Sequence, residues 1–160
     1  MSTLQERLVV ACPYVRAREY LSDTLSEPAN QHREERLPLT AQVEHLPAQF
    51  EKNVVVRYSA GRDPMHFDEP WHVSWSPEGG GPYPDFSGEL TVRADEGYGS
   101  SVLELTGTYT PPLGAAGKVF DAAVGRKIAS VTAQNLLASI AAQMVERYER
   151  EEAAKKQPGP

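Results

Sequence analysis

Two adjacent amides, Gln134 and Asn135, interrupt a long apolar stretch near the C-terminus, where an ordinary core would carry apolar side chains. A buried amide without a hydrogen-bond partner costs about 1–3 kcal/mol, so such groups are normally paired. One interpretation is that both amides face a cavity and orient a polar group of a ligand. The alternative is that they bond to a neighbouring strand or face solvent. The sequence leaves both interpretations open.

Two tryptophans, Trp71 and Trp75, lie in the segment WHVSWSP, where alternation places both on one face of a predicted strand. An indole ring offers a large apolar area and one N–H donor, which suits a ligand pocket and equally an ordinary core.

His45 continues the apolar face of an earlier predicted strand. It could act as a general acid or base near neutral pH, or be a strand-end residue bonded to the backbone.

The sequence gives little support for metal, phosphate or covalent chemistry. His66 and His72 lie near acidic residues, but in a proline-rich segment, whereas a structural zinc site fixes four ligands in defined geometry. The run EGGGP lacks the GK[ST] of a phosphate-binding loop and precedes a strand. No GxSxG motif occurs, and the single cysteine, Cys12, adjoins Pro13 in an apolar segment where a thiolate is costly. We therefore expect no metal and no cofactor, assign no catalytic residue, and predict that Cys12 is a core residue.

Length and composition indicate a single soluble domain. The 160 residues are 40% hydrophobic and 24% charged, with a formal net charge of −6. Lysines and arginines do not cluster outside the predicted helices, which argues against nucleic acid or an anionic membrane as partner. No apolar run approaches the roughly 20 residues of a membrane span, and the N-terminus lacks a signal-peptide pattern. We expect a cytoplasmic protein.

Hydrophobic periodicity predicts the elements that would position these residues. A helix is predicted over 14–25, after Pro13. Period-two alternation predicts strands over 5–12, 36–45, 52–59, 71–77, 86–94 and 100–109. Pro38 predicts that the second of these strands lies at a sheet edge or begins there.

A second, long helix is predicted after Gly117, ending near Arg150 and followed by a fraying tail. Its predicted apolar stripe consists of Phe120, Val124, Val131, Ala138, Ala142 and Val145. An antiparallel sheet that is polar on one face must cover its other face, and only this helix is long enough. The predicted fold is therefore α+β, a helix-grip arrangement in which a curved antiparallel sheet wraps around the C-terminal helix.

The segments WHVSWSP, YPDFSGELTV and LELTGTYTPPLGAAGKVFDAAVGRKIA resemble those of the START-like, or SRPBCC, superfamily of helix-grip proteins. The superfamily includes polyketide aromatases/cyclases and the Bet v 1 plant allergens, and the resemblance covers about residues 5–150. It implies one domain over 1–150, a flexible tail over 151–160, and a deep apolar cavity between sheet and helix for hydrophobic small molecules. It does not imply one reaction.

Three functions remain open from the sequence. The first is binding of a hydrophobic or amphipathic small molecule; the second is an aromatase/cyclase-like enzyme; the third is a protein-interaction module with a filled core. The predicted ligand contacts are Trp71, Val73, Trp75, Phe86, Leu90, Leu105, Tyr109, Phe120, Val131, Gln134, Asn135, His45 and Tyr58. A homodimer is plausible if the predicted strand containing Leu37 exposes an apolar edge.

Overall fold

The computed structural model describes residues 2–25, 33–39, 52–59, 71–77, 85–97, 99–110 and 122–156. The strands are β1 (Ser2–Val10), β2 (Arg33–Leu39), β3 (Lys52–Ser59), β4 (Trp71–Pro77), β5 (Asp85–Ala94) and β6 (Ser101–Thr110). The helices are α1 (Tyr14–Leu25) and α2 (Ala122–Lys156). The predicted order of strand, helix, strands and long helix is confirmed, with β1 starting earlier and ending two residues before Cys12.

The six strands form one antiparallel sheet in the order β1-β6-β5-β4-β3-β2. From β2 to β6 each strand pairs with the next along the chain, and β1 closes the other side by pairing with β6. β2 is thus an edge strand, as Pro38 predicts, because proline has no N–H to donate to a further strand. His45 lies outside the described residues.

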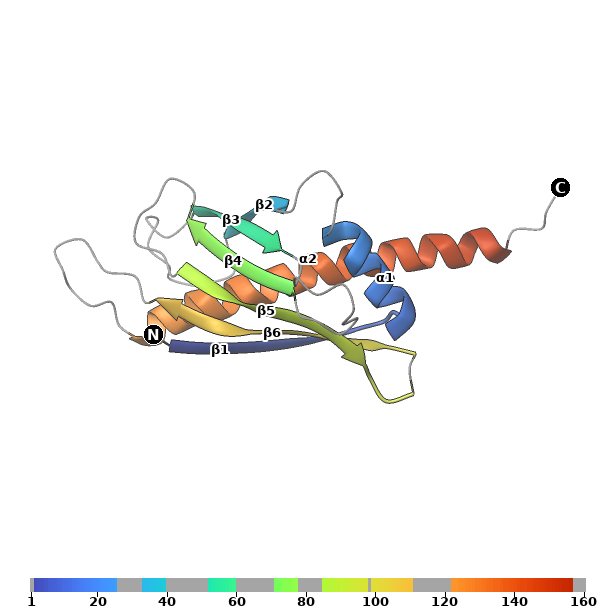
Figure 1. Cartoon of the computed structure of the whole chain (residues 1–160), viewed down its shortest axis with the longest axis horizontal. Helices are drawn as coiled ribbons and strands as arrows, with labels where there is room; N and C mark the ends of the chain where they lie inside the picture. The colour runs from blue at the N-terminus through green and yellow to red at the C-terminus, as the bar shows by residue number, and fades with distance from the viewer. Residues whose placement is uncertain are drawn as a thin grey trace.

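Alternation along the strands separates a buried face from an exposed one, as the sequence predicts. On β3, Val54, Val56 and Tyr58 are buried while Arg57 is exposed. The inner face continues through buried residues of β4, β5 and β6, which share one core cluster with residues of α2. The long helix runs along the curved sheet, and α1 lies near its C-terminal half (Figure 1). The α+β helix-grip arrangement is therefore confirmed.

The predicted apolar stripe of α2 is wrong at Ala138 and Ala142, whereas Val131 is buried and Val145 packs against the core. The side chains packed into the core are Ile128, Ala129, Ala133, Leu136, Leu137, Ala141 and Met144, whereas Ala138 and Ala142 are exposed. Residues 128–145 contain no charged side chain, so several apolar stripes run along this helix. The large aliphatic groups decide which one is buried, since an exposed alanine costs little. Of the predicted stripe, Val131 is buried, and the side chains of Phe120 and Val124 are outside the description.

The predicted boundary at Arg150 is also wrong, because α2 continues to Lys156. Glu151 accepts a hydrogen bond from Tyr20 of α1, and Lys155 donates to Glu152 at 3.1 Å. Residues 151–156 are therefore helical; Glu151 contacts α1, whereas residues 153–156 are exposed.

By length and composition, α2 could also cross a membrane, since it contains an 18-residue window of mean hydropathy 1.3. The prediction that no such run exists overlooked this stretch. Half of the window is buried within the protein, against the sheet. Its apolar character is accounted for by the core that it covers.

Two glycines face each other across β5 and β6, at the registered pair Gly88 and Gly107. A Cβ atom at Gly88 would lie 2.3 Å from the Thr106 carbonyl oxygen and 2.5 Å from the Phe86 ring. A Cβ atom at Gly107 would lie 2.3 Å from the Ser87 carbonyl oxygen and 2.7 Å from the same ring. The Phe86 ring therefore occupies the space over both glycines and lies down on the sheet. Such aromatic cover of strand glycines compensates for their missing side chains.

Replacing either glycine by alanine should force the strands or the Phe86 ring apart. We expect Gly88→Ala and Gly107→Ala each to lower the free energy of unfolding by about 1–3 kcal/mol, measured by urea denaturation. Gly99→Ala is the matched control, because a Cβ there meets nothing within 4 Å. Its effect should stay within about 0.5 kcal/mol. Equal effects at all three positions would contradict the close approach.

Candidate functional site

The inner face of the sheet presents three rows of side chains that run across the strands, set by the pairing register. The leucine row is Trp71, Leu90 and Leu105; the glycine row is Tyr58, Val73, Gly88 and Gly107; the aromatic row is Val56, Trp75, Phe86 and Tyr109. We call these three rows the inner wall. Apart from Trp71 and the glycines, every member is buried. The eight wall residues expected as ligand contacts are thus brought together on one face.

The helix does not lie evenly over this wall. α2 approaches β1 and β6 most closely, whereas β3, β4 and β5 lie farther from its backbone. The aromatic side chains are on the farther strands: Tyr58 on β3, Trp75 on β4 and Phe86 on β5. Long side chains therefore reach into the space beneath the helix where the backbones are apart.

Trp75 and Phe86 are the centre of the aromatic row. Their ring centroids are 4.1 Å apart and their planes differ by 16°, a stacked arrangement. Both rings are buried, and the tip of the Phe86 ring lies over the glycine pair. We call this stacked pair the aromatic layer.

One polar atom in this layer lacks a partner. Only 2% of Trp75 is exposed, and its indole nitrogen, Nε1, has no hydrogen-bond partner. Its registered neighbours on β3 and β5 are Val56 and Phe86, whose side chains contain no acceptor. A buried donor left unpaired costs about 1–3 kcal/mol, so it calls for an explanation beyond packing.

The charged side chains of the described central strands point away from the wall. Arg57, His72, Glu89 and Arg93 are all exposed. The prediction that His72 faces outward is confirmed. An acidic group, Glu6, stands at the β1 edge of the inner face, in the alternation Leu4, Glu6, Leu8 and Val10, and it is paired with Leu105 in register.

Glu6 explains the position of Gln134. The Gln134 amide donates to the Glu6 carboxylate at 3.3 Å, and Ser130 of the same helix also donates to Glu6. Gln134 is exposed, so its amide ties α2 to the edge strand and does not point into the wall. This is the second of the two interpretations given by the sequence. Asn135 is partly buried and remains a candidate contact.

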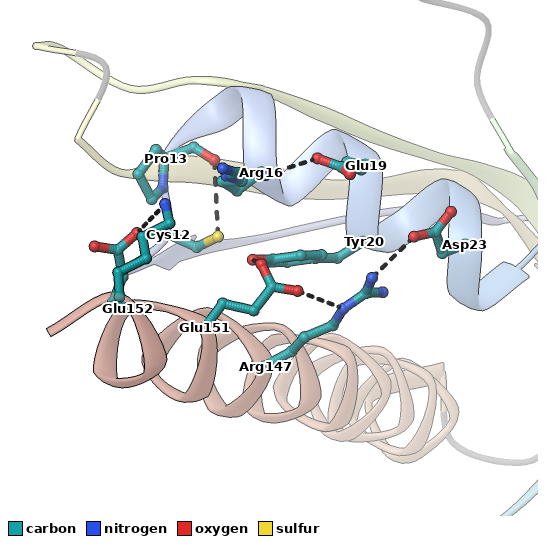
Figure 2. A network of polar contacts seen from close by, with 10 residues as sticks. Cys12, Pro13, Arg16, Glu19, Tyr20, Asp23, Arg147, Glu151 and Glu152 are labelled. Atoms are coloured by element: carbon teal, nitrogen blue, oxygen red, sulfur yellow. Dashed lines mark hydrogen bonds and ion pairs between the residues drawn. The ribbon is translucent and has the colours of Figure 1, made fainter. Parts of the chain in front are cut away.

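A separate polar cluster joins α1 to the C-terminal half of α2 (Figure 2). Tyr20 is almost fully buried and donates its hydroxyl to Glu151. Arg147 bonds to Asp23 at 3.0 Å and to Glu151 at 3.4 Å, and its guanidinium lies 4.4 Å from the centre of the Tyr20 ring. We call these four residues the interhelix cluster. Sequence reasoning missed it because the residues bonded between the two helices are 124 or more positions apart.

Titration in the interhelix cluster follows from burial and pairing. Burial, together with the bond to Glu151, raises the pKa of Tyr20 to about 12. The Tyr20 hydroxyl lowers the pKa of Glu151, since it stabilises the carboxylate, and Arg147 acts in the same direction. The cluster is therefore a charge-assisted structural contact at neutral pH, with Tyr20 protonated and Glu151 ionised.

Cys12 is completely buried beside this cluster, as predicted for a core residue. Burial raises the pKa of its thiol to about 11, so the reactive thiolate is suppressed. Among the described side chains, no group of three or more His, Cys, Asp or Glu could hold a metal ion. His66 and its acidic neighbours lie outside the described ranges.

Comparison with known proteins gives structural but not sequence matches. No family model and no curated protein matches the sequence. The structure is similar to the Zhui aromatase/cyclase from Streptomyces sp. R1128, with a TM-score of 0.56, 19% identity, and coverage of 96% of this chain and 97% of that one. A conserved protein from Geobacillus kaustophilus gives 0.57 at 9% identity, covering 91% and 96%.

A START superfamily protein from Mycobacterium smegmatis is also matched, with a TM-score of 0.46, 14% identity, and coverage of 90% and 97%. At these identities the similarity shows the fold alone. The chain shares its helix-grip fold with the Zhui aromatase/cyclase, and its function must be argued from the inner wall.

The interhelix cluster yields a prediction about stability. Tyr20→Phe should lower the free energy of unfolding at pH 7 by about 1–2 kcal/mol, since it removes a hydrogen bond to a charged group. Because the pKa of Tyr20 is raised from 10.0 to about 12, folding favours its protonated form. This contribution is complete below pH 10 and is lost as the pH rises toward 12.

The measurement is urea unfolding of wild type and Tyr20→Phe across pH 7–12, where their difference should shrink above pH 10. Asp23→Asn is the control, since it removes an ion pair whose side chains are 38% and 54% exposed. Exposed pairs contribute about 0–1 kcal/mol. A loss in Tyr20→Phe no larger than in Asp23→Asn would show that the Tyr20 hydroxyl is not a main contact.

Proposed function

We propose that this chain binds a hydrophobic or amphipathic small molecule between the inner wall and α2. The observation that carries the proposal is the buried Trp75 indole N–H, a donor without a partner among the described residues, on an inner wall that also includes the phenols Tyr58 and Tyr109. Pockets for small molecules combine apolar walls with a few placed polar groups. The greater distance of β3, β4 and β5 from α2 supports the same location.

Each part of the site has a distinct energetic role in this proposal. The wall residues Val73, Leu90 and Leu105 supply apolar area, worth roughly 25 cal/mol per Å² removed from water. Trp75 and Phe86 supply a flat stacking surface. Val131 and Asn135 would contact the ligand from α2, and Phe120 and His45 remain proposed contacts from outside the described ranges.

An aromatase/cyclase-like reaction on a polyketide-type substrate is the second candidate. Its support is the fold shared with the Zhui aromatase/cyclase, together with two phenols on the inner wall, Tyr58 and Tyr109. Proton transfer would require one of these hydroxyls within hydrogen-bond reach of the substrate. Glu6 is less suited, because Ser130 and Gln134 already donate to it.

A filled-core interaction module is the third candidate, in which Trp71, Trp75 and Phe120 would close on one another. The stacking partner of Trp75 is Phe86, and Trp71 is only partly buried.

We also propose a cytoplasmic location, one domain over residues 1–150 extended by the end of α2, and a homodimer that pairs through the β2 edge. Size-exclusion chromatography with light scattering tests the dimer.

The test of ligand binding uses native mass spectrometry and a neutral probe, Nile red. Protein purified under native conditions should carry a mass excess that disappears on denaturation. Val73→Phe adds a ring in the glycine row and should weaken Nile red binding about tenfold by filling the space. Ser74→Phe adds the same ring on the opposite face and should leave binding unchanged. Similar binding by both variants, with circular dichroism showing both folded, would place the probe elsewhere.

A further inference from the structure

The surroundings of the Trp75 indole limit what can pair with it. One face of the ring is covered by Phe86, and the indole nitrogen is buried, so its N–H does not reach bulk water. Val56 and Phe86, its registered neighbours, offer only carbon, and the N–H has no partner among the described residues. A molecule bound beside Trp75 would satisfy this N–H only with a hydrogen-bond acceptor.

The charge of the inner face determines which kind of acceptor is suitable. On β3, β4 and β5 the described cationic side chains, Arg57 and Arg93, are exposed, as are Arg126 and Lys127 of α2. A buried carboxylate needs a cation or several donors, because a single N–H does not compensate for its lost hydration. The acidic Glu6 on the same face would further disfavour an anion.

A pure hydrocarbon is disfavoured for the opposite reason. It would fill the apolar wall but leave the indole N–H unpaired, and sites with a buried donor discriminate against analogues that lack the matching group. A neutral carbonyl or ether oxygen meets both requirements, because it accepts one hydrogen bond and brings no charge.

We infer that the ligand is a neutral, largely apolar molecule that presents a carbonyl-type oxygen to Trp75 Nε1. Trp75 is thus the residue that selects the ligand by its polar group. This inference rests on the proposed function, and it adds two exclusions, one of carboxylate ligands and one of hydrocarbons.

The experiment uses three probes of nearly identical shape: 9-fluorenone, fluorene and fluorene-9-carboxylate. Dissociation constants are measured by equilibrium dialysis for wild type, Trp75→Phe and Ser74→Phe, whose substitution lies on the opposite face of β4. We expect wild type and Ser74→Phe to bind fluorenone about tenfold more tightly than fluorene, and the carboxylate more weakly than both. Trp75→Phe should bind the ketone and the hydrocarbon equally, since it keeps an aromatic ring but has no N–H.

A second readout does not depend on the stability of Trp75→Phe. The protein has two tryptophans, so the indole N–H signal of ¹⁵N-labelled wild type that remains in Trp71→Phe is assigned to Trp75 and followed in wild type. Fluorenone should move this proton signal downfield as the hydrogen bond forms, whereas fluorene should not.

The outcomes separate the inference from the proposed function. Equal binding of fluorenone and fluorene by wild type, or a ketone preference that persists in Trp75→Phe, would overturn the inference while ligand binding stands. Tightest binding of the carboxylate would overturn it as well. Binding of none of the three probes would overturn the proposed function, and the inference with it.

Discussion

The structure depends on one constraint: a six-stranded antiparallel sheet with one apolar face needs a cover, and α2 is long enough to provide it. Ile128, Leu136 and Met144 bury their side chains in the same core as the sheet. The helix lies closest to β1 and β6, where Glu6 receives hydrogen bonds from Ser130 and Gln134. The cover is thereby attached along one side of the sheet, and the aromatic residues of β3, β4 and β5 occupy the other side.

The glycine pair gives the inner wall its shape. Side chains at positions 88 and 107 would collide with the neighbouring backbone, so the strands approach closely there. Phe86 covers this approach, and Trp75 stacks on Phe86. Both rings are buried by these contacts, and the indole N–H is placed inside the protein as a consequence. The unpaired donor is thus produced by the same packing that holds β5 to β6.

Much of the fold could be predicted from the sequence, because the inner and outer residues of β3, β4, β5 and β6 differ strongly in polarity. The buried face of α2 could not, since residues 128–145 lack charged side chains and several faces were equally apolar. Alternation along each strand predicted which residues lie on the wall. It did not predict the pairing register between neighbouring strands, which places Gly88 opposite Gly107. The role of Gln134 depends on Glu6, 128 positions away. Glu6 itself was detectable as a charge in the inward alternation of β1.

α2 is held both far from the proposed site and beside it. The interhelix cluster holds the helix near Arg147 and Glu151, whereas Ser130 and Gln134, which donate to Glu6, adjoin the proposed helix contacts Val131 and Asn135. A helix held at these two places can keep its position when the wall takes up a ligand, as the proposed function requires. In that proposal Trp75 selects the ligand through its hydrogen bond, and the interhelix cluster holds α2 away from the proposed site.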